Sequence, residues 1–302
     1  MESLLTLAFD NLSSPTTTKI RKGLRQIEGL LAQICLSPTP QNAPAGHARR
    51  ASVLPTPTPS STQLTQHKPL SALPTDPAFA EFFRLQESFE WNVATRLTTT
   101  LTTLLSHPPT PALDSTLHST LSLLQGTLLL HPPSRTLFAR EPPMTALLDL
   151  LDPVASPDVQ GAALLALVSA LLGTPRAART FEAADGLRTV AALFRRPGTE
   201  RAVKVRVVEF LYFYLMEETP ATEGAAVGAG GIGSAEGDGK KGEGSGKGSG
   251  KSEEGKSVHT RSTAEKQRLL ARYMSNVEDL VQDLRESAFG GVEVGIADDE
   301  PR

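Results

Sequence analysis

Hydrophobic residues recur along most of the chain at the spacing of an α-helix. In segment 16–36, residues four and three positions apart form one hydrophobic stripe, which is the period of an amphipathic helix. The stripe consists of Ile20, Leu24, Ile27, Leu31 and Ile34. No segment alternates hydrophobic and polar residues with a period of two between turn signals, so β-sheets are not expected. The pattern therefore predicts a protein built from helices.

Several helices are predicted to begin at a capping residue followed by proline. The capping side chain accepts a backbone hydrogen bond, and proline costs nothing where its missing N–H would have no partner. The pairs are Asp76-Pro77, Thr110-Pro111, Ser156-Pro157 and Thr174-Pro175. From Asp76 we expect one helix whose broad hydrophobic face continues through Phe89 to Leu104. Segment 203–215 is hydrophobic nearly all round, which predicts a central or strongly covered helix.

An internal repeat is visible with an offset of 44 residues. The segment 135–141 recurs as 179–185, and each copy is followed by a partner helix, predicted over 144–151 and 187–194. This offset lies within the period of armadillo and HEAT repeats, about 40–47 residues. Because one unit cannot bury its hydrophobic face alone, neighbouring units must stack. We therefore predict an all-α, armadillo-like helical solenoid, with an irregular helical bundle as the alternative.

Two stretches have compositions that do not support a packed core. One is rich in Pro, Thr and Ser, and the other in Gly, Ser, Lys and Glu, so both are expected to be disordered. A capping box at Ser262–Glu265 begins a predicted C-terminal amphipathic helix. The predicted organisation is N-terminal solenoid helices 1–36, disordered loop 37–75, repeat body 76–218, flexible tether 219–261, C-terminal helix 262–288 and disordered tail 289–302.

Charge and cysteine content exclude several classes of protein. The net charge is −3, which gives no global attraction for nucleic acid or an anionic membrane. The single cysteine, Cys35, allows neither an intrachain disulfide nor a cysteine-built zinc site, and its position predicts a buried small hydrophobic side chain. The longest uncharged apolar run, 161–173, is too short to span a bilayer. With no signal peptide recognisable, we expect a soluble intracellular protein.

No pattern of reactive residues points to catalysis. The glycine-rich stretch lacks the spacing of a phosphate-binding loop, and no histidine pair stands at metal-ligand spacing with a carboxylate. No acidic pair is marked out for acid–base work, which argues against a helical hydrolase. We therefore expect no enzyme activity, no catalytic residues, no cofactor and no metal site.

Two aromatic residues are candidate partner-binding anchors, Phe89 and Trp91. Tryptophan is enriched in binding hot spots, and the alternative for Trp91 is a core or flank aromatic. Arg135 and Arg179 occupy the same position of the repeat, where they either cap carbonyls and pair with acids or face a partner.

Ser52 is a candidate phosphosite. His47, Arg49 and Arg50 stand five, three and two residues before it, a spacing that basophilic kinases, particularly nuclear-Dbf2-related kinases, prefer. The alternative is an unused basic patch.

The chain resembles the fungal cell division control protein fourteen family, a component of the septation initiation network that is unrelated to the phosphatase of the same name. The resemblance rests mainly on segments 10–14, 19–33, 82–94, 125–135 and 209–215. It implies a non-catalytic adaptor that binds and supports a germinal-centre-type protein kinase and promotes septum formation and cytokinesis. It also implies other septation-network partners and recruitment from the cytoplasm to the spindle pole body. The alternative is a generic armadillo-type interaction scaffold in another pathway, such as trafficking.

Overall fold

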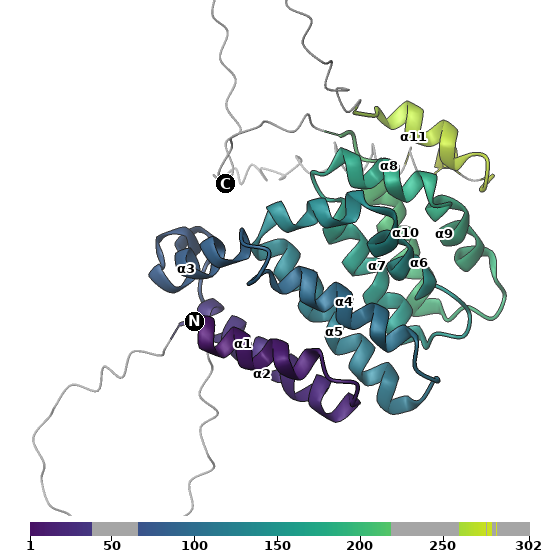
Figure 1. The fold of residues 1–302 in the computed structure, drawn as a ribbon. Helices are drawn as coiled ribbons and strands as arrows, with labels where there is room; N and C mark the ends of the chain where they lie inside the picture. Colours follow the sequence, from purple (N-terminus) through teal and green to yellow (C-terminus); the bar gives the residue numbers. More distant parts are fainter. Residues whose placement is uncertain (38–65, 219–259, 276, 280–281, 283–302) are drawn as a thin grey trace, which may run out of the picture.

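A computed structural model describes residues 1–37, 66–218, 260–275, 277–279 and 282. The described residues form an all-α protein (Figure 1), as the hydrophobic pattern predicts. Its α-helices are α1 (Glu2–Leu12), α2 (Thr17–Cys35), α3 (Pro77–Gln86), α4 (Val93–Leu105), α5 (Pro111–Leu130), α6 (Glu141–Asp149), α7 (Pro157–Leu171), α8 (Pro175–Ala183), α9 (Gly186–Arg195), α10 (Arg201–Leu215) and α11 (Thr263–Leu270).

The end of the predicted disordered loop 37–75 is ordered, so that boundary is wrong. Leu36–Ser37 (β1) and Gln66–His67 (β2) form a short antiparallel pair, and Leu70–Thr75 is a 3-10 helix, η1. Lys68 explains this order, because its ammonium donates to the carbonyl of Ile34 at 2.9 Å and forms an ion pair with Asp76. The rest of the predicted loop, 38–65, lies outside the described residues.

The single helix predicted from Asp76 to Leu104 is in fact two helices, α3 and α4. Asp76 caps α3 as expected, since its carboxylate accepts from the backbone N–H of Ala78 at 2.7 Å. The hydrophobic spacing continues through residues 87–92, but Asn92 caps a new helix there. The periodicity therefore hides a connection that is set by polar contacts.

The two repeat units each contain three helical elements, as predicted, but the third helix of each unit, which was expected to be long, has only 9 residues in α6 and 10 in α9. In the first unit the short element is a 3-10 helix, η2 (Pro132–Ala139), between α5 and α6; in the second it is α8, between α7 and α9. The units stack through α5 on α7 and through η2 on α8, and α10 packs on the other side of α7. This stacking fits the armadillo-like interpretation, which remains a prediction.

One continuous hydrophobic core extends from α1 to the C-terminal segment. In the second unit, the ring of Phe181 lies 5.5 Å from that of Phe210 and 6.1 Å from that of Tyr214. A Cβ atom at Gly186 would stand only 2.2 Å from the Phe181 ring, so glycine is required there. Leu211 is completely buried, whereas Val205 on the same helix is 50% exposed. Helix α10 is therefore covered along one face, which is less than the sequence predicts.

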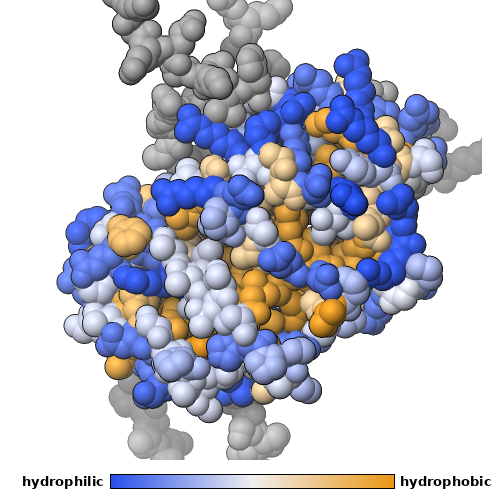
Figure 2. Space-filling model, turned by 45° about the vertical axis from the view of Figure 1, so that its right-hand side comes forward, coloured by the Kyte–Doolittle hydropathy of each residue, from blue (hydrophilic) through white to orange (hydrophobic). Residues whose placement is uncertain are grey.

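Some large hydrophobic side chains remain on the surface. Figure 2 shows a hydrophobic band across the middle of one face, with hydrophilic residues along its margins. The exposed large hydrophobic residues of the described part are Leu4, Leu7, Phe89, Leu129, Val154, Leu172, Val205 and Met216.

The predicted C-terminal helix is interrupted by a turn, because residues 271–275 are not helical whereas residues 277–279 and 282 are helical again. The capping box is confirmed, because Ser262 and Glu265 bond reciprocally, but α11 ends at Leu270 and a turn follows. The prediction of one helix over 262–288 is therefore wrong. Met274 and Val277 belong to the same hydrophobic core as Leu270. In Figure 1, α11 lies next to α8, at the opposite end of the body from α1 and α2.

Candidate partner-binding surface

The connection between α3 and α4, residues 87–92, carries both candidate anchors. Phe89 is 79% exposed, whereas Trp91 is half-buried and packs against the hydrophobic core. The structure therefore separates their roles: Phe89 faces solvent, and Trp91 attaches the connection to the body.

Asn92 joins this connection to a distant part of the chain. Its side-chain amide donates to the carbonyl of Gln86 at 2.6 Å and to the hydroxyl of Ser134 at 2.9 Å. Its side-chain oxygen accepts from the backbone N–H of Thr95 at 2.8 Å, which caps α4. One buried side chain thus ends α3, begins α4 and fastens both to η2.

Gln86 closes the connection from the other side. Its side-chain oxygen accepts from the backbone N–H of Val93 at 2.7 Å, and its amide donates to the carbonyl of Trp91 at 3.2 Å. Gln86 is 1% exposed, so these bonds are made away from water, where an unsatisfied polar group is costly. The backbone that presents Phe89 is therefore held at both ends.

His131 completes the network beneath the connection. Its Nδ1 lies 2.8 Å from the Ser134 hydroxyl, and its ring meets the ring of Phe83 edge-on at 4.6 Å. Burial lowers the pKa of His131 to about 4, because a charged imidazolium would lose its hydration. At neutral pH the imidazole is uncharged, which suits a role in packing and positioning.

Four residues of this network were not singled out by the sequence analysis: Gln86, Asn92, His131 and Ser134. The one available signal was Asn92, since asparagine before an apolar helical stretch is typical of an N-cap. The partners could not be found this way, because Asn92 and Ser134 are 42 residues apart.

Of the two alternatives for the repeated arginines, the structure shows the first: they cap carbonyls and pair with acids. Arg135 donates to the carbonyls of Leu128 at 2.9 Å and Leu172 at 3.0 Å, and so joins α5 to α7. Arg179 forms ion pairs with Glu182 and Glu218. The candidate phosphosite Ser52 lies outside the described residues.

The described residues contain no group of three or more His, Cys, Asp or Glu side chains placed to hold a metal ion. Among the helices described here, none is both long and apolar enough to cross a membrane.

These observations define a class, an all-α protein of stacked helical units whose polar network positions an exposed aromatic residue. The comparisons with known proteins then give the family. The family profile described as "Cell division control protein 14, SIN component" matches residues 1–289, and the chain belongs to this family. It is also 26% identical over 211 residues to the Schizosaccharomyces pombe protein named Cell division control protein 14, covering 67% of this chain and 75% of that protein. No solved structure matches.

As a member of this family, the protein is a component of the septation initiation network, involved in the control of cell division.

Proposed function

We propose that the protein is a non-catalytic adaptor that binds and supports a germinal-centre-type protein kinase in the septation initiation network. In this role it promotes septum formation and cytokinesis, with recruitment from the cytoplasm to the spindle pole body. Family membership supports the place in the network. The family resemblance, which rests on segments 10–14, 19–33, 82–94, 125–135 and 209–215, supports the kinase as partner.

The observation that carries the proposal is the fixed exposure of Phe89. A single exposed hydrophobic residue is ordinary on a protein surface, but this one stands on a connection held by the Gln86 and Asn92 hydrogen bonds. A backbone segment that is already held in one conformation loses little conformational entropy on binding. Phe89 therefore has the properties of an interface anchor.

The surroundings of Phe89 indicate the chemistry of the partner. Glu87 and Glu90 flank it, and both are exposed. An apolar pocket with a basic rim would bury the ring and complement these two carboxylates. We expect such a pocket on the kinase side of the interface.

The test is affinity purification of the tagged full chain from dividing cells, followed by mass spectrometry. The Phe89→Ala variant is compared with Val154→Ala, because Val154 is 77% exposed and lies between α6 and α7. Loss of an anchor costs at least about 2 kcal/mol of binding, or roughly thirtyfold in affinity. We expect the kinase to be lost with Phe89→Ala and kept with Val154→Ala.

Two outcomes would contradict the proposal. Equal kinase recovery by both variants would remove Phe89 from the interface. Recovery of no kinase by the natural chain would favour a scaffold in another pathway, such as trafficking.

Phosphorylation of Ser52 by a nuclear-Dbf2-related kinase is a separate part of the proposal. Phosphate would add about −1.5 to −2 charges beside Arg49 and Arg50 and so alter partner recruitment. Phosphopeptide mapping with and without inhibition of the downstream kinase tests it. Modification that persists unchanged under inhibition would reject this kinase, and an unmodified Ser52 with good peptide coverage would reject the site.

A further inference from the structure

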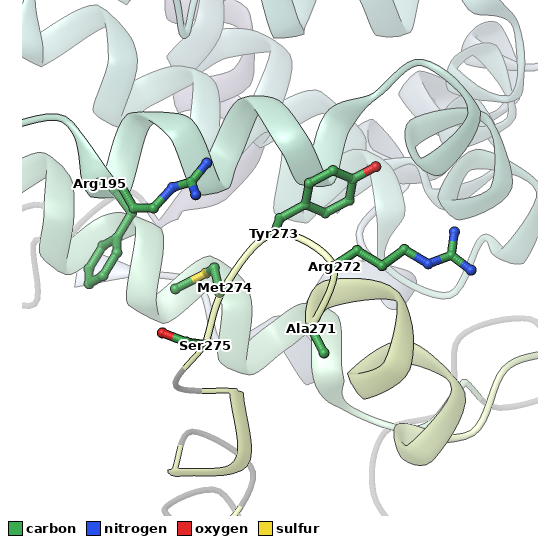
Figure 3. Close-up of a pocket in the computed structure, with 7 residues that line it drawn as sticks. Arg195, Ala271, Arg272, Tyr273, Met274 and Ser275 are labelled. Atoms are coloured by element: carbon green, nitrogen blue, oxygen red, sulfur yellow. The ribbon is translucent and has the colours of Figure 1, made fainter.

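The C-terminal clasp, defined here as residues 260–275 and 277–279, packs on the outer side of α8 and α10 (Figure 1). Three of its hydrophobic side chains enter the core: Leu270 is fully buried, Met274 is 6% exposed and Val277 is 2% exposed. The turn after α11 passes the end of α9 at Arg195, and together they line an open pocket of about 350 Å³ (Figure 3). The clasp therefore makes a real hydrophobic contact with the body.

Lys266 is the best-buried charge of the clasp, at 4% exposure. Its ammonium lies 3.2 Å from the carboxylate of Glu218, donates to the carbonyl of Met216 at 2.8 Å and stands 5.2 Å from the centre of the Tyr214 ring. A carboxylate, a carbonyl and an aromatic face are the groups that stabilise a desolvated cation. The body thus provides a complete binding site for one lysine.

A second cation of the clasp, Arg261, binds beside it. Its guanidinium lies 3.1 Å from the carboxylate of Glu182, which also accepts from the hydroxyl of Tyr214 at 2.8 Å. Arg179, from the body, pairs with both Glu182 and Glu218. With the clasp in place, the side chains of Glu182 and Glu218 are each 10% exposed. Without the clasp, Arg179 would be the one cation paired with these two carboxylates. The surface is therefore acidic and matches a basic segment.

The repeat explains why this surface exists. Leu128, Leu172 and Met216 follow one another at intervals of 44 residues, near the ends of α5, α7 and α10. The carbonyls of the first two accept from Arg135, and that of Met216 accepts from Lys266. A side chain of the clasp thus donates to the carbonyl of Met216, just as a side chain of the repeat donates to the carbonyls of Leu128 and Leu172. The outer side of α8 and α10 is the side on which a next repeat unit would stack, and the clasp lies there in its place.

The residues on either side of segment 219–259 lie next to each other, so this segment has no distance to span between the body and the clasp. The backbone N–H of Arg261 donates to the carboxylate of Glu218 at 3.0 Å, and the backbone N–H of Glu218 donates to the carbonyl of Arg261 at 3.3 Å. The two ends of the intervening segment 219–259 therefore meet at one point. The contacts described above are made by residues on either side of this segment.

We propose that the outer side of α8 and α10 is a docking surface for a basic amphipathic helix, and that the clasp of the same molecule is its occupant. The recognition elements are a lysine in the site formed by Glu218, Met216 and Tyr214, an arginine on Glu182, and a leucine that enters the core. The clasp behaves as a tethered ligand, which separates from the body when these contacts are lost.

The experiment uses the full chain with a protease site inserted within 219–259. After cleavage at about 10 µM protein, gel filtration shows whether the C-terminal fragment stays with the body. We expect the natural sequence to co-elute as a one-to-one complex, from a chain that was monomeric before cleavage. Release of the natural fragment would overturn the proposal. A dimer before cleavage would mean that a second copy supplies the clasp, which would overturn its placement in the same molecule.

Lys266→Met tests the ionic site while keeping a long apolar side chain. Loss of one partner of a buried, hydrogen-bonded ion pair weakens binding by at least about thirtyfold, so this fragment should elute separately. Arg268→Ala is the matched control, because Arg268 is an exposed cation on the same helix, and it should be retained. Equal behaviour of the two variants would overturn the recognition by Lys266. Circular dichroism should show a body that stays helical after release; a body that unfolds or aggregates would overturn the description of the clasp as a ligand.

Discussion

The α3–α4 connection and the C-terminal clasp are both fastened to the helical body by buried polar groups from distant parts of the chain. The connection uses neutral groups: two amides, a hydroxyl and the uncharged imidazole of His131. The clasp uses charges, with two carboxylates shared among three cations. Neutral hydrogen bonds respond little to salt, whereas ion pairs weaken as salt screens them. The difference indicates a fixed platform at one site and a separable contact at the other.

The largest expected effect comes from the core that underlies the clasp. Leu211 in α10 is fully buried, and Leu211→Ala should reduce the free energy of unfolding by roughly 2–5 kcal/mol through lost contacts and a cavity. Urea unfolding of the full chain measures it. A change below about 0.5 kcal/mol is typical of surface sites. It would show that Leu211 of α10 does not belong to the core beneath the clasp.

Asn92→Ala should have the next largest effect. The change removes the N-cap of α4 and leaves the carbonyl of Gln86 and the hydroxyl of Ser134 without this donor. We expect a loss of about 2–3 kcal/mol in the free energy of unfolding. Thr99→Ala is the control, since Thr99 is exposed on α4 and bonds only within its helix. Similar losses in both variants would contradict the special role of Asn92.

His131, which lies beneath the α3–α4 connection, makes the stability of the protein depend on pH. Because folding lowers its pKa from 6.5 to about 4, the unfolded chain binds more protons between these values, and the free energy of unfolding falls as the pH drops through them. From pH 7 to pH 5 this one group should contribute a loss of about 2 kcal/mol.

The contribution of His131 is isolated by comparing denaturation of the natural chain with His131→Gln at both pH values. The variant should lose less stability on acidification. His118→Gln changes an exposed histidine and should keep the full dependence. If His131→Gln keeps it too, the pH dependence arises elsewhere.

The smallest expected effect separates the two regions directly. Raising the salt concentration from 0.1 to 1 M shortens the screening length from about 10 to 3 Å and should weaken the clasp by less than about 1 kcal/mol, since its partners are partly buried. Amide hydrogen exchange should become faster in 262–270 and change little in 86–93. Equal responses in the two segments would remove the distinction between them.

Local signals in the sequence were sufficient to predict much of the fold. The capping residue and proline at Thr110-Pro111 mark the start of α5, and the Ser262–Glu265 box marks the start of α11. Both signals depend on atoms within one helical turn. The hydrophobic segment 203–215 also predicted a helix, which is α10.

What the sequence did not reveal depends on contacts between distant residues. The break between α3 and α4 interrupts no hydrophobic pattern, and it is fixed by Ser134, 42 residues from Asn92. Lys266 and Met216 are 50 residues apart, and nothing local in either helix marks them as partners. Phe89 was singled out as a candidate anchor but was placed on the hydrophobic face of a helix, and its exposure and its support by Gln86 became visible only in three dimensions.

The meeting of Glu218 with Arg261 also bears on how this protein can diverge between species. When both ends of a connecting segment are held at the same point, inserted residues need not span any distance. For a flexible segment, doubling its length costs only about 0.6 kcal/mol in closure entropy. Residues 219–259, which the sequence predicts to be a flexible tether, should therefore be free to gain or lose glycine-rich repeats by replication slippage, while the helices on either side keep their register. Orthologues should differ most in length at this junction.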